Sequence, residues 1–192
     1  MADGTLKVGT ITTSSGSGTI TLGQSGETLN VGTGVVSRLG KFESQLLHVR
    51  DEKASDVGGG TFTAGAWRTR TLNTVVTNEI TGASLSSNQI TLPSGTYYID
   101  ASAPAYVSSR HKVVLYNITD SAFDMIGTSE FNTNGSAVVT RSFVKGRFTI
   151  SAQKTFELQH HCETTDGGNG LGVKSIFGQV CVYAEVQIWR TA

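Results

Sequence analysis

The sequence predicts an all-β protein, a ten-strand antiparallel sandwich of the jelly-roll type preceded by an extended β-rich arm. Three observations support this fold class. Short segments of alternating apolar and polar residues recur along most of the chain. Turn-forming residues separate these segments, and the 192-residue chain contains 23 glycines. No segment shows the sustained apolar period of about 3.6 residues that an amphipathic helix requires.

Composition and charge limit the classes of function. Lysine plus arginine and aspartate plus glutamate each number 15, so the formal net charge is zero. Binding to nucleic acid depends on clustered basic residues, which this balance does not favour. Hydrophobic residues make up 38% of the chain, enough for a core, so a disordered chain is not expected. The length suits one domain plus an appendage.

The first 40 residues form a separate compositional region with few charges. Gly9-Thr10-Ile11-Thr12 recurs as Gly18-Thr19-Ile20-Thr21 and, more weakly, as Gly26-Glu27-Thr28-Leu29. Such short strands are marginal alone, so they need a partner. We interpret residues 1–40 as an anchoring and trimerisation arm; a flexible Gly/Ser/Thr linker is the alternative. The apolar candidates for anchoring and for the trimer interface are Ile11, Ile20 and Leu29.

Residues 41–192 carry the alternating segments of the jelly-roll domain. The ten expected strands lie near residues 43–50, 66–71, 74–80, 88–92, 95–103, 111–117, 123–128, 139–150, 154–161 and 179–190. In the last strand, valines at every second position are expected to face the core. Tyr183 and Trp189 alternate with them, so both are predicted on the opposite face, as candidates for the subunit interface.

One stretch of this domain resembles the tumour necrosis factor and complement globular-head family. Residues 90–99 read ITLPSGTYYI, a short strand ending in proline followed by Gly-x-Tyr-Tyr on the next strand. HKVVLYN (111–117), FTISAQKTFELQH (148–160) and the terminal VCVYAEVQIW follow in the family's order, over about 120 residues. The resemblance implies a ten-strand jelly roll that assembles as a homotrimer about a threefold axis.

A second stretch resembles small jelly-roll domains of bacteriophage fibre proteins. Residues 58–73, GGGTFTAGAWRTRTLN, look like the "GAW-R-LN" stretch of those domains, which often carry an N-terminal arm rich in GTIT and GSG. The resemblance implies a phage fibre or virion-appendage protein. It gives no basis for the receptor or calcium functions of the animal family.

The titratable residues do not form a recognisable catalytic pattern. There is no Gly-x-Ser-x-Gly nucleophile elbow. Cys162 follows His160 and His161, but adjacent residues of a strand point to opposite faces, so His161 and Cys162 are not expected to act as a pair. The acidic residues show no spacing that selects a glycosidase pair. We therefore expect a protein that is not an enzyme and uses no cofactor.

Metal binding is also not expected. His160 and His161 could ligate a metal with Glu163 or Asp166, although a histidine pair at a strand end is more often simply hydrogen-bonded. Within the loop 163–170, the turn Asp166-Gly167-Gly168-Asn169-Gly170 could offer oxygens to calcium, which needs six to eight of them, but this turn supplies two side chains at best. Whether this loop binds a cation stays open at this point.

The combined reading is a trimeric virion structural protein. The favoured function is that of a tail fibre or receptor-binding protein whose arm attaches to the virion and whose jelly roll contacts a host surface glycan or protein. A head fibre or decoration protein on the capsid is the alternative. Loop residues expected to contact the receptor are Trp67, Tyr106, Asn132, Asn134 and Asn169.

Cellular context follows from the cysteines and the first residues. Two cysteines are too few for a disulfide framework, and we expect Cys162 and Cys181 to be free thiols, with a disulfide between them as the alternative. Met1 to Gly4 show neither a basic nor an apolar region of a secretory signal, and no segment is apolar enough to span a membrane. We expect assembly in the host cytoplasm into the virion, without membrane insertion.

Overall fold

The computed structural model describes residues 45–133 and 137–191, and all of its regular elements there are β-strands. The predicted all-β class is confirmed. The strands are β1 (Gln45–Lys53), β2 (Arg68–Thr69), β3 (Thr74–Asn78), β4 (Ser84–Ser86), β5 (Gln89–Leu92), β6 (Gly95–Tyr106), β7 (Ser109–Asn117), β8 (Ala122–Asn132), β9 (Val139–Ile150), β10 (Lys154–Cys162) and β11 (Cys181–Arg190). No helix that could cross a membrane occurs in these described ranges.

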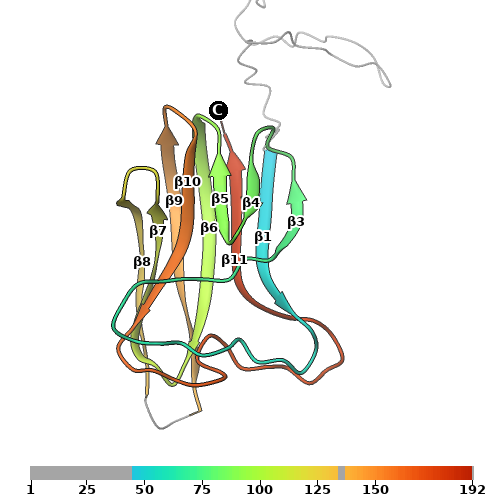
Figure 1. The fold of residues 1–192 in the computed structure, drawn as a ribbon, viewed down its shortest axis with the longest axis vertical. Coiled ribbons are helices and arrows are strands. Elements are labelled where there is room, and N and C mark those ends of the chain that lie inside the picture. Colours follow the sequence, from blue (N-terminus) through green and yellow to red (C-terminus); the bar gives the residue numbers. More distant parts are fainter. Residues whose placement is uncertain (1–44, 134–136, 192) are drawn as a thin grey trace, which may run out of the picture. The chain divides into compact units, whose positions relative to one another are not determined.

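Two antiparallel sheets face each other as a jelly-roll sandwich (Figure 1). The five-stranded sheet has the order β3-β1-β11-β6-β9, and the six-stranded sheet has the order β4-β5-β10-β7-β8 with β2 added beside β10. Consecutive strands repeatedly change sheets, as between β5 and β6 and between β10 and β11. The predicted arm, with Ile11, Ile20 and Leu29, lies outside the described residues.

The core forms where alternate side chains of the two sheets meet. Its buried members include Leu47 of β1, Ile99 of β6, Val113 of β7 and Leu158 of β10. The first tyrosine of the Gly-x-Tyr-Tyr motif, Tyr97, is fully buried there, and its hydroxyl donates a hydrogen bond to the carbonyl of Pro93 (2.7 Å). The motif thus fixes the β5–β6 turn to the core.

One side of the sandwich is closed by hydrogen bonds between the sheets. The hydroxyl of Ser142 in β9 donates to the carbonyl of Thr128 in β8 (2.6 Å) and accepts from the amide of Val113 (3.0 Å). The amide of Phe143 donates to the hydroxyl of Thr128 (3.0 Å). Because β8 and β9 are the edge strands of their sheets, these bonds cover two edges that would otherwise be free to pair.

Strand β11 departs from the predicted alternation at one point. Arg50 of β1 pairs with Glu185, whereas Glu52, two residues later, pairs with Val182, three residues earlier. The extra residue is a β-bulge, which shifts the side chains beyond it to the other face. Tyr183 is therefore buried (3% exposed), and its hydroxyl donates to the carbonyl of Val57 (2.6 Å). The prediction that Tyr183 lies on the outward face is wrong.

Both cysteines are buried free thiols, as predicted. Cys162 lies at the end of β10 and packs with Phe62 and Ala105 in a small second core. Burial raises the pKa of the Cys162 thiol to about 11, so the thiolate is disfavoured at neutral pH. Together with its opposite orientation to His161 along the strand, this leaves Cys162 without the features of a nucleophile.

Candidate functional site

The long connection between β1 and β3 builds the main candidate site, because it crosses the six-stranded sheet (Figure 1). Within it, β2 pairs with β10 through Arg68 opposite His160 and Thr69 opposite Gln159. Phe62, earlier in the connection, pairs in the same way with Asp166. These two pairings hold the segment between them, including Trp67, against the sheet.

The indole of Trp67 lies across strand β7. Its ring centre is 5.2 Å from that of Phe123 in β8 and 5.3 Å from that of His161 in β10, the strands on either side of β7. Val114 of β7, on the strand between Phe123 and His161, is fully buried and lies outside the main core cluster. Tyr116 extends the group, with its ring 5.4 Å from Phe123. We call Trp67, Tyr116, Phe123 and His161 the Trp67 cluster.

The Trp67 cluster remains accessible at the surface. Phe123 is 47% exposed, and Trp67, Tyr116 and His161 are half-buried. Exposed aromatic side chains gathered at one place are a common mark of a binding surface, since they bury a large area at low entropic cost. Among the predicted receptor-binding residues, Trp67 is the one that the structure places in such a group.

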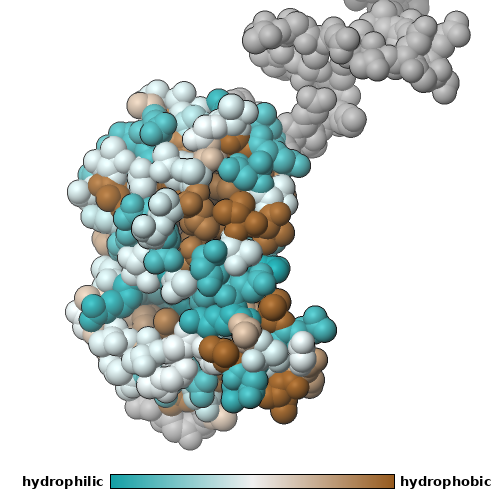
Figure 2. Space-filling model, turned by 45° about the vertical axis from the view of Figure 1, so that its right-hand side comes forward, coloured by the Kyte–Doolittle hydropathy of each residue, from teal (hydrophilic) through white to brown (hydrophobic). Residues whose placement is uncertain are grey.

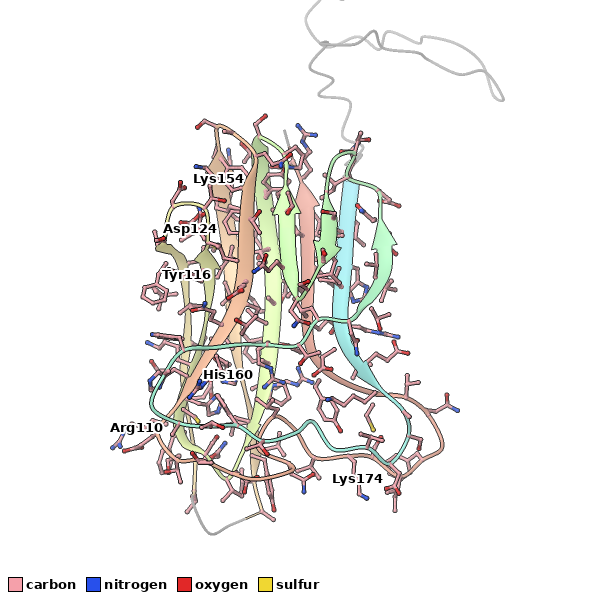
Figure 3. The ribbon with its side chains drawn as sticks, viewed as in Figure 1. Arg110, Tyr116, Asp124, Lys154, His160 and Lys174 are labelled. Carbon is pink, nitrogen blue, oxygen red and sulfur yellow. The ribbon has the colours of Figure 1, made fainter. Side chains whose placement is uncertain are left out.

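A shallow hollow of about 260 Å³ lies beside Trp67. Its lining includes Trp67, His161, Arg110, Lys112, Ser129 and Glu130. Arg110 is already paired, because its guanidinium donates to both carboxylate oxygens of Glu163 (2.8 and 2.9 Å). Figure 3 shows Arg110 pointing outward below the level of His160. The hollow therefore has an aromatic wall on one side. Its other groups are cations, a carboxylate and a hydroxyl.

A buried polar chain runs beneath this hollow, between the sheets. Nε2 of His111 lies 2.7 Å from the hydroxyl of Thr140, and Nδ1 of His111 lies 3.0 Å from Nε2 of His160. Nδ1 of His160 in turn lies 3.5 Å from the fully buried guanidinium of Arg70. Arg70 also donates to the carbonyls of Pro104 (3.2 Å) and Leu171 (2.9 Å). The chain thus joins β7, β9 and β10 to two long connections.

Burial keeps both histidines of this chain neutral. Burial, with the Arg70 cation as the second cause, lowers the pKa of His111 to about 4 and lowers that of His160 well below its usual value. Burial also lowers the pKa of Arg70, to about 10, which leaves it charged at neutral pH. His160 faces the interior and His161 faces outward, so the two cannot ligate one ion together.

Among the described residues, no three His, Cys, Asp or Glu side chains converge as a metal site would require. Glu163 is engaged by Arg110, whereas Asp166 pairs with Phe62 through its backbone and keeps one buried carboxylate oxygen without a hydrogen-bond partner. The nitrogens of His111 and the ring of His160 take part in the hydrogen-bonded chain that joins Thr140 to Arg70.

The other predicted receptor-binding residues lie away from the Trp67 cluster or outside the description. Asn132 is buried (1% exposed); its side-chain oxygen accepts from the amide of Ser108 (2.7 Å) and its nitrogen donates to the carbonyl of Ala105 (2.9 Å). It holds the β6–β7 turn, so its predicted exposure is wrong. Tyr106 and Asn169 are half-buried, in β6 and in the β10–β11 connection, and Asn134 lies outside the described residues.

The outward face of the five-stranded sheet is a second surface of interest. Trp189 of β11 is half-buried there, and its ring centre is 6.1 Å from that of Tyr98, which is 43% exposed. A hollow of about 250 Å³ on this face is bordered by Asp100, Lys145 and Glu185. Lys145 pairs with Asp100 (2.8 Å), and Glu185 pairs with His48 (2.7 Å). The face therefore carries both signs of charge beside aromatic rings.

Comparisons with known proteins bear on the fold. No protein-family model and no curated protein matches the sequence. The structure is similar to the globular domain of zebrafish complement 1qA protein, with 16% sequence identity, 78% of this chain and 98% of that chain covered, and a TM-score of 0.51. It is also similar to murine APRIL at pH 5.0, with 9% identity, 77% and 99% of the two chains covered, and a TM-score of 0.53.

The fold is that of the tumour necrosis factor and complement globular heads. This confirms the part of the sequence resemblance that rests on the Gly-x-Tyr-Tyr motif and on the order of the strands. At these identities the likeness establishes the fold alone.

Sequence reasoning missed most of the Trp67 cluster. The sequence places Phe123 and Tyr116 only as strand residues, and it offers His161 as a metal ligand or as a base beside Cys162, not as part of an aromatic surface. The signal available was their position, since both aromatics fall on the side of their strand that alternates away from the core. No local pattern indicates that Trp67 meets Phe123, because 56 positions separate them and the crossing depends on the β2–β10 pairing.

Proposed function

We propose that this chain is a non-enzymatic bacteriophage virion protein, a trimeric tail fibre or receptor-binding protein that assembles in the host cytoplasm. Residues 1–40 attach it to the virion, and the six-stranded sheet contacts the host surface through the Trp67 cluster. Support for the phage assignment comes from the resemblance of residues 58–73 to fibre jelly rolls. The same residues contain the connection that carries Trp67.

One observation carries the receptor-binding role. The Trp67 cluster packs on the six-stranded sheet, whereas Trp189 lies on the outward face of the five-stranded sheet. The two surfaces therefore belong to opposite sheets of the sandwich. A trimer formed through the five-stranded sheet leaves the Trp67 cluster pointing away from the threefold axis. Three equivalent surfaces then face outward, and binding several copies of a receptor gains avidity.

Support for a trimer through the five-stranded sheet comes from its surface chemistry. Tyr98 and Trp189 supply aromatic area, and the mixed charges of Asp100, Lys145 and Glu185 allow one copy to complement another. The fold likeness to the complement and tumour necrosis factor heads is consistent with this arrangement. A head fibre or decoration trimer on the capsid is the second candidate, because an attachment arm at residues 1–40 suits a capsid partner as well as a tail partner.

The test is competition for adsorption to host cells. Purified full-length protein is added to cells before phage, and free phage is counted after a fixed time. We expect the wild-type protein to reduce adsorption at least tenfold, and the Trp67→Ala variant to lose this effect. Phe177→Ala, which removes an 84% exposed aromatic residue from the β10–β11 connection, serves as the matched control and should still compete. Unchanged adsorption with wild-type protein would count against receptor binding and in favour of the capsid alternative.

A further inference from the structure

We propose that the hollow beside Trp67 binds one neutral pyranose ring of a surface glycan. In this arrangement an apolar C–H face of the sugar lies against the indole, and the sugar hydroxyls bond to Lys112, Ser129 and Glu130. The inference deepens the proposed function and rests on it, because it names the chemical class of the receptor. It concerns this site alone and does not depend on the oligomeric state.

The indole is held in place before any ligand arrives. The rings of Phe123 and His161 flank it at interplanar angles of 51° and 67°. The backbone on its C-terminal side is fixed by the pairing of Arg68 with His160, and the Arg68 side chain donates back to the carbonyl of Thr63 (3.4 Å). A flat apolar surface that needs no ordering on binding loses little entropy, which suits a weakly apolar ligand such as a sugar ring.

The polar groups at the hollow match what sugar hydroxyls need. Each hydroxyl both donates and accepts a hydrogen bond, so its site must offer both kinds of group. The ammonium of Lys112 offers three donors, Glu130 offers carboxylate acceptors, and Ser129 can act either way. One oxygen of Glu130 accepts from the hydroxyl of Thr128 (3.0 Å), which leaves its second oxygen for a ligand.

The charge balance favours a neutral ligand over a phosphate or an acidic sugar. Arg110 is compensated by Glu163 in a two-bond ion pair, and Lys112 shares the hollow with Glu130. The site therefore carries no net positive charge with which to attract a polyanion. Its volume of about 260 Å³ offers room for a single sugar ring beside the indole.

The experiment is a ligand-observed NMR titration of the full-length protein. The probes are methyl glycosides of glucose, galactose, mannose and N-acetylglucosamine, with glucuronic acid, sialic acid and inorganic phosphate as acidic comparators. We expect saturation transfer to at least one neutral glycoside, strongest at the protons of one ring face. Binding should weaken at least tenfold in Trp67→Ala and several-fold in Lys112→Ala and Glu130→Gln. Phe177→Ala should bind as wild type does.

Several results would overturn the inference. They are no transfer to any neutral glycoside, unchanged binding in Trp67→Ala, or tighter binding of an acidic comparator than of every neutral sugar. Because Trp67→Ala removes a packed side chain, thermal unfolding of each variant is recorded. Lys112→Ala and Glu130→Gln change only surface groups and keep the test decisive if Trp67→Ala unfolds.

A cell-binding assay separates failure of this inference from failure of the proposed function. Fluorescent protein is added to host cells treated with periodate, which destroys sugar diols, or with protease. Loss of binding after periodate alone supports a glycan receptor. Loss after protease alone contradicts the glycan and leaves receptor binding intact. Absence of binding to untreated cells contradicts the proposed function itself.

Discussion

His111 and His160 are hydrogen-bonded to each other in an interior that also holds the cation of Arg70. A proton on either ring would place a second positive charge beside a buried guanidinium. The cost of that arrangement, together with burial, lowers the pKa of both rings. Native packing in this region therefore requires neutral imidazoles.

The protein should lose stability as the pH falls below about 6.5. A histidine whose folded pKa is depressed contributes stability above its unfolded pKa, and this contribution is lost as pH falls from there toward the folded pKa. For His111, with a folded pKa of about 4, the loss reaches roughly 2 kcal/mol at pH 5. Urea unfolding at pH 7.5, 6 and 5 measures the effect.

A matched variant separates the effect of the histidines on the pH dependence of stability from the effect of the carboxylates. Asp51 is buried, and burial raises its pKa. The folded state therefore binds a proton at Asp51 more readily than the unfolded state does. As the pH falls, Asp51 adds stability, whereas the histidines lose it. His160→Gln removes one ring and leaves Asp51 unchanged. We expect the variant to be less stable at pH 7.5 but less sensitive between pH 7.5 and 5 than the wild type. Equal pH dependence in both proteins would show that His160 is not a cause of the loss of stability.

At the scale of single residues, the sequence could indicate surface chemistry but not burial. Trp67 is predicted to contact a receptor, and the structure places it half-buried in a surface cluster of aromatic rings, while the receptor contact itself stays a prediction. Asn132 is predicted to contact a receptor as well. It is buried because the β6–β7 turn leaves the amide of Ser108 without a strand partner, and no local pattern reveals that need.

Among the elements, strands β7, β8 and β9 approach one another closely at Gly127 of β8. A Cβ atom at this position would lie 2.5 Å from the carbonyl oxygen of Val113 and 2.6 Å from that of Phe143. Both atoms belong to the backbone of strands β7 and β9, so neither can move aside cheaply. Glycine is needed here because of the close approach of three strands, not because of its dihedral angles.

Gly127→Ala should destabilise the sandwich by about 1–3 kcal/mol, because the methyl group forces β8 away from β9. Urea unfolding at neutral pH measures the difference in free energy. Gly167→Ala is the control, since a Cβ there meets no atom within 4 Å, and it should change stability little. A Gly127→Ala protein as stable as the control would contradict the packing described for this edge.

The strands themselves could be located from the sequence almost completely. All ten expected strands are present, because alternation and turn residues such as Pro93-Ser94-Gly95 bound them clearly. The strand that was missed, β4, is three residues long and reads Ser-Leu-Ser, too short to show a period. The bulge in β11 was missed because it depends on the register with β1, which is a property of the pair and not of either strand.

For the whole molecule, assembly through the five-stranded sheet predicts a mass near three times the 20.3 kDa chain mass. Light scattering on the purified protein measures it. Trp189→Ala should shift the population toward monomer, because it removes aromatic area from the face shared with Tyr98. Tyr183→Phe should leave the mass unchanged, since Tyr183 is inside the subunit. A wild-type protein that stays monomeric at high concentration would contradict the trimer.

The surface of the described chain carries exposed apolar residues in more than one region. Figure 2 shows apolar residues in separate patches between polar ones. Val57, Val173, Ile176, Phe177 and Val180 are exposed apolar residues of the connections at one end of the sandwich. Phe177 borders neither hollow and is not part of the Trp67 cluster, which makes the Phe177 variant a control for both surfaces.

The central claim is that this protein projects from a virion to meet the host. Electron microscopy of whole virions labelled with a gold-conjugated antibody against residues 45–191 tests it most directly. The account predicts label at the tail tip or collar, with the Trp67 surface available to the antibody. Label spread over the capsid would contradict the tail-fibre assignment in favour of a head fibre or decoration protein, and virions without label would contradict a virion role altogether.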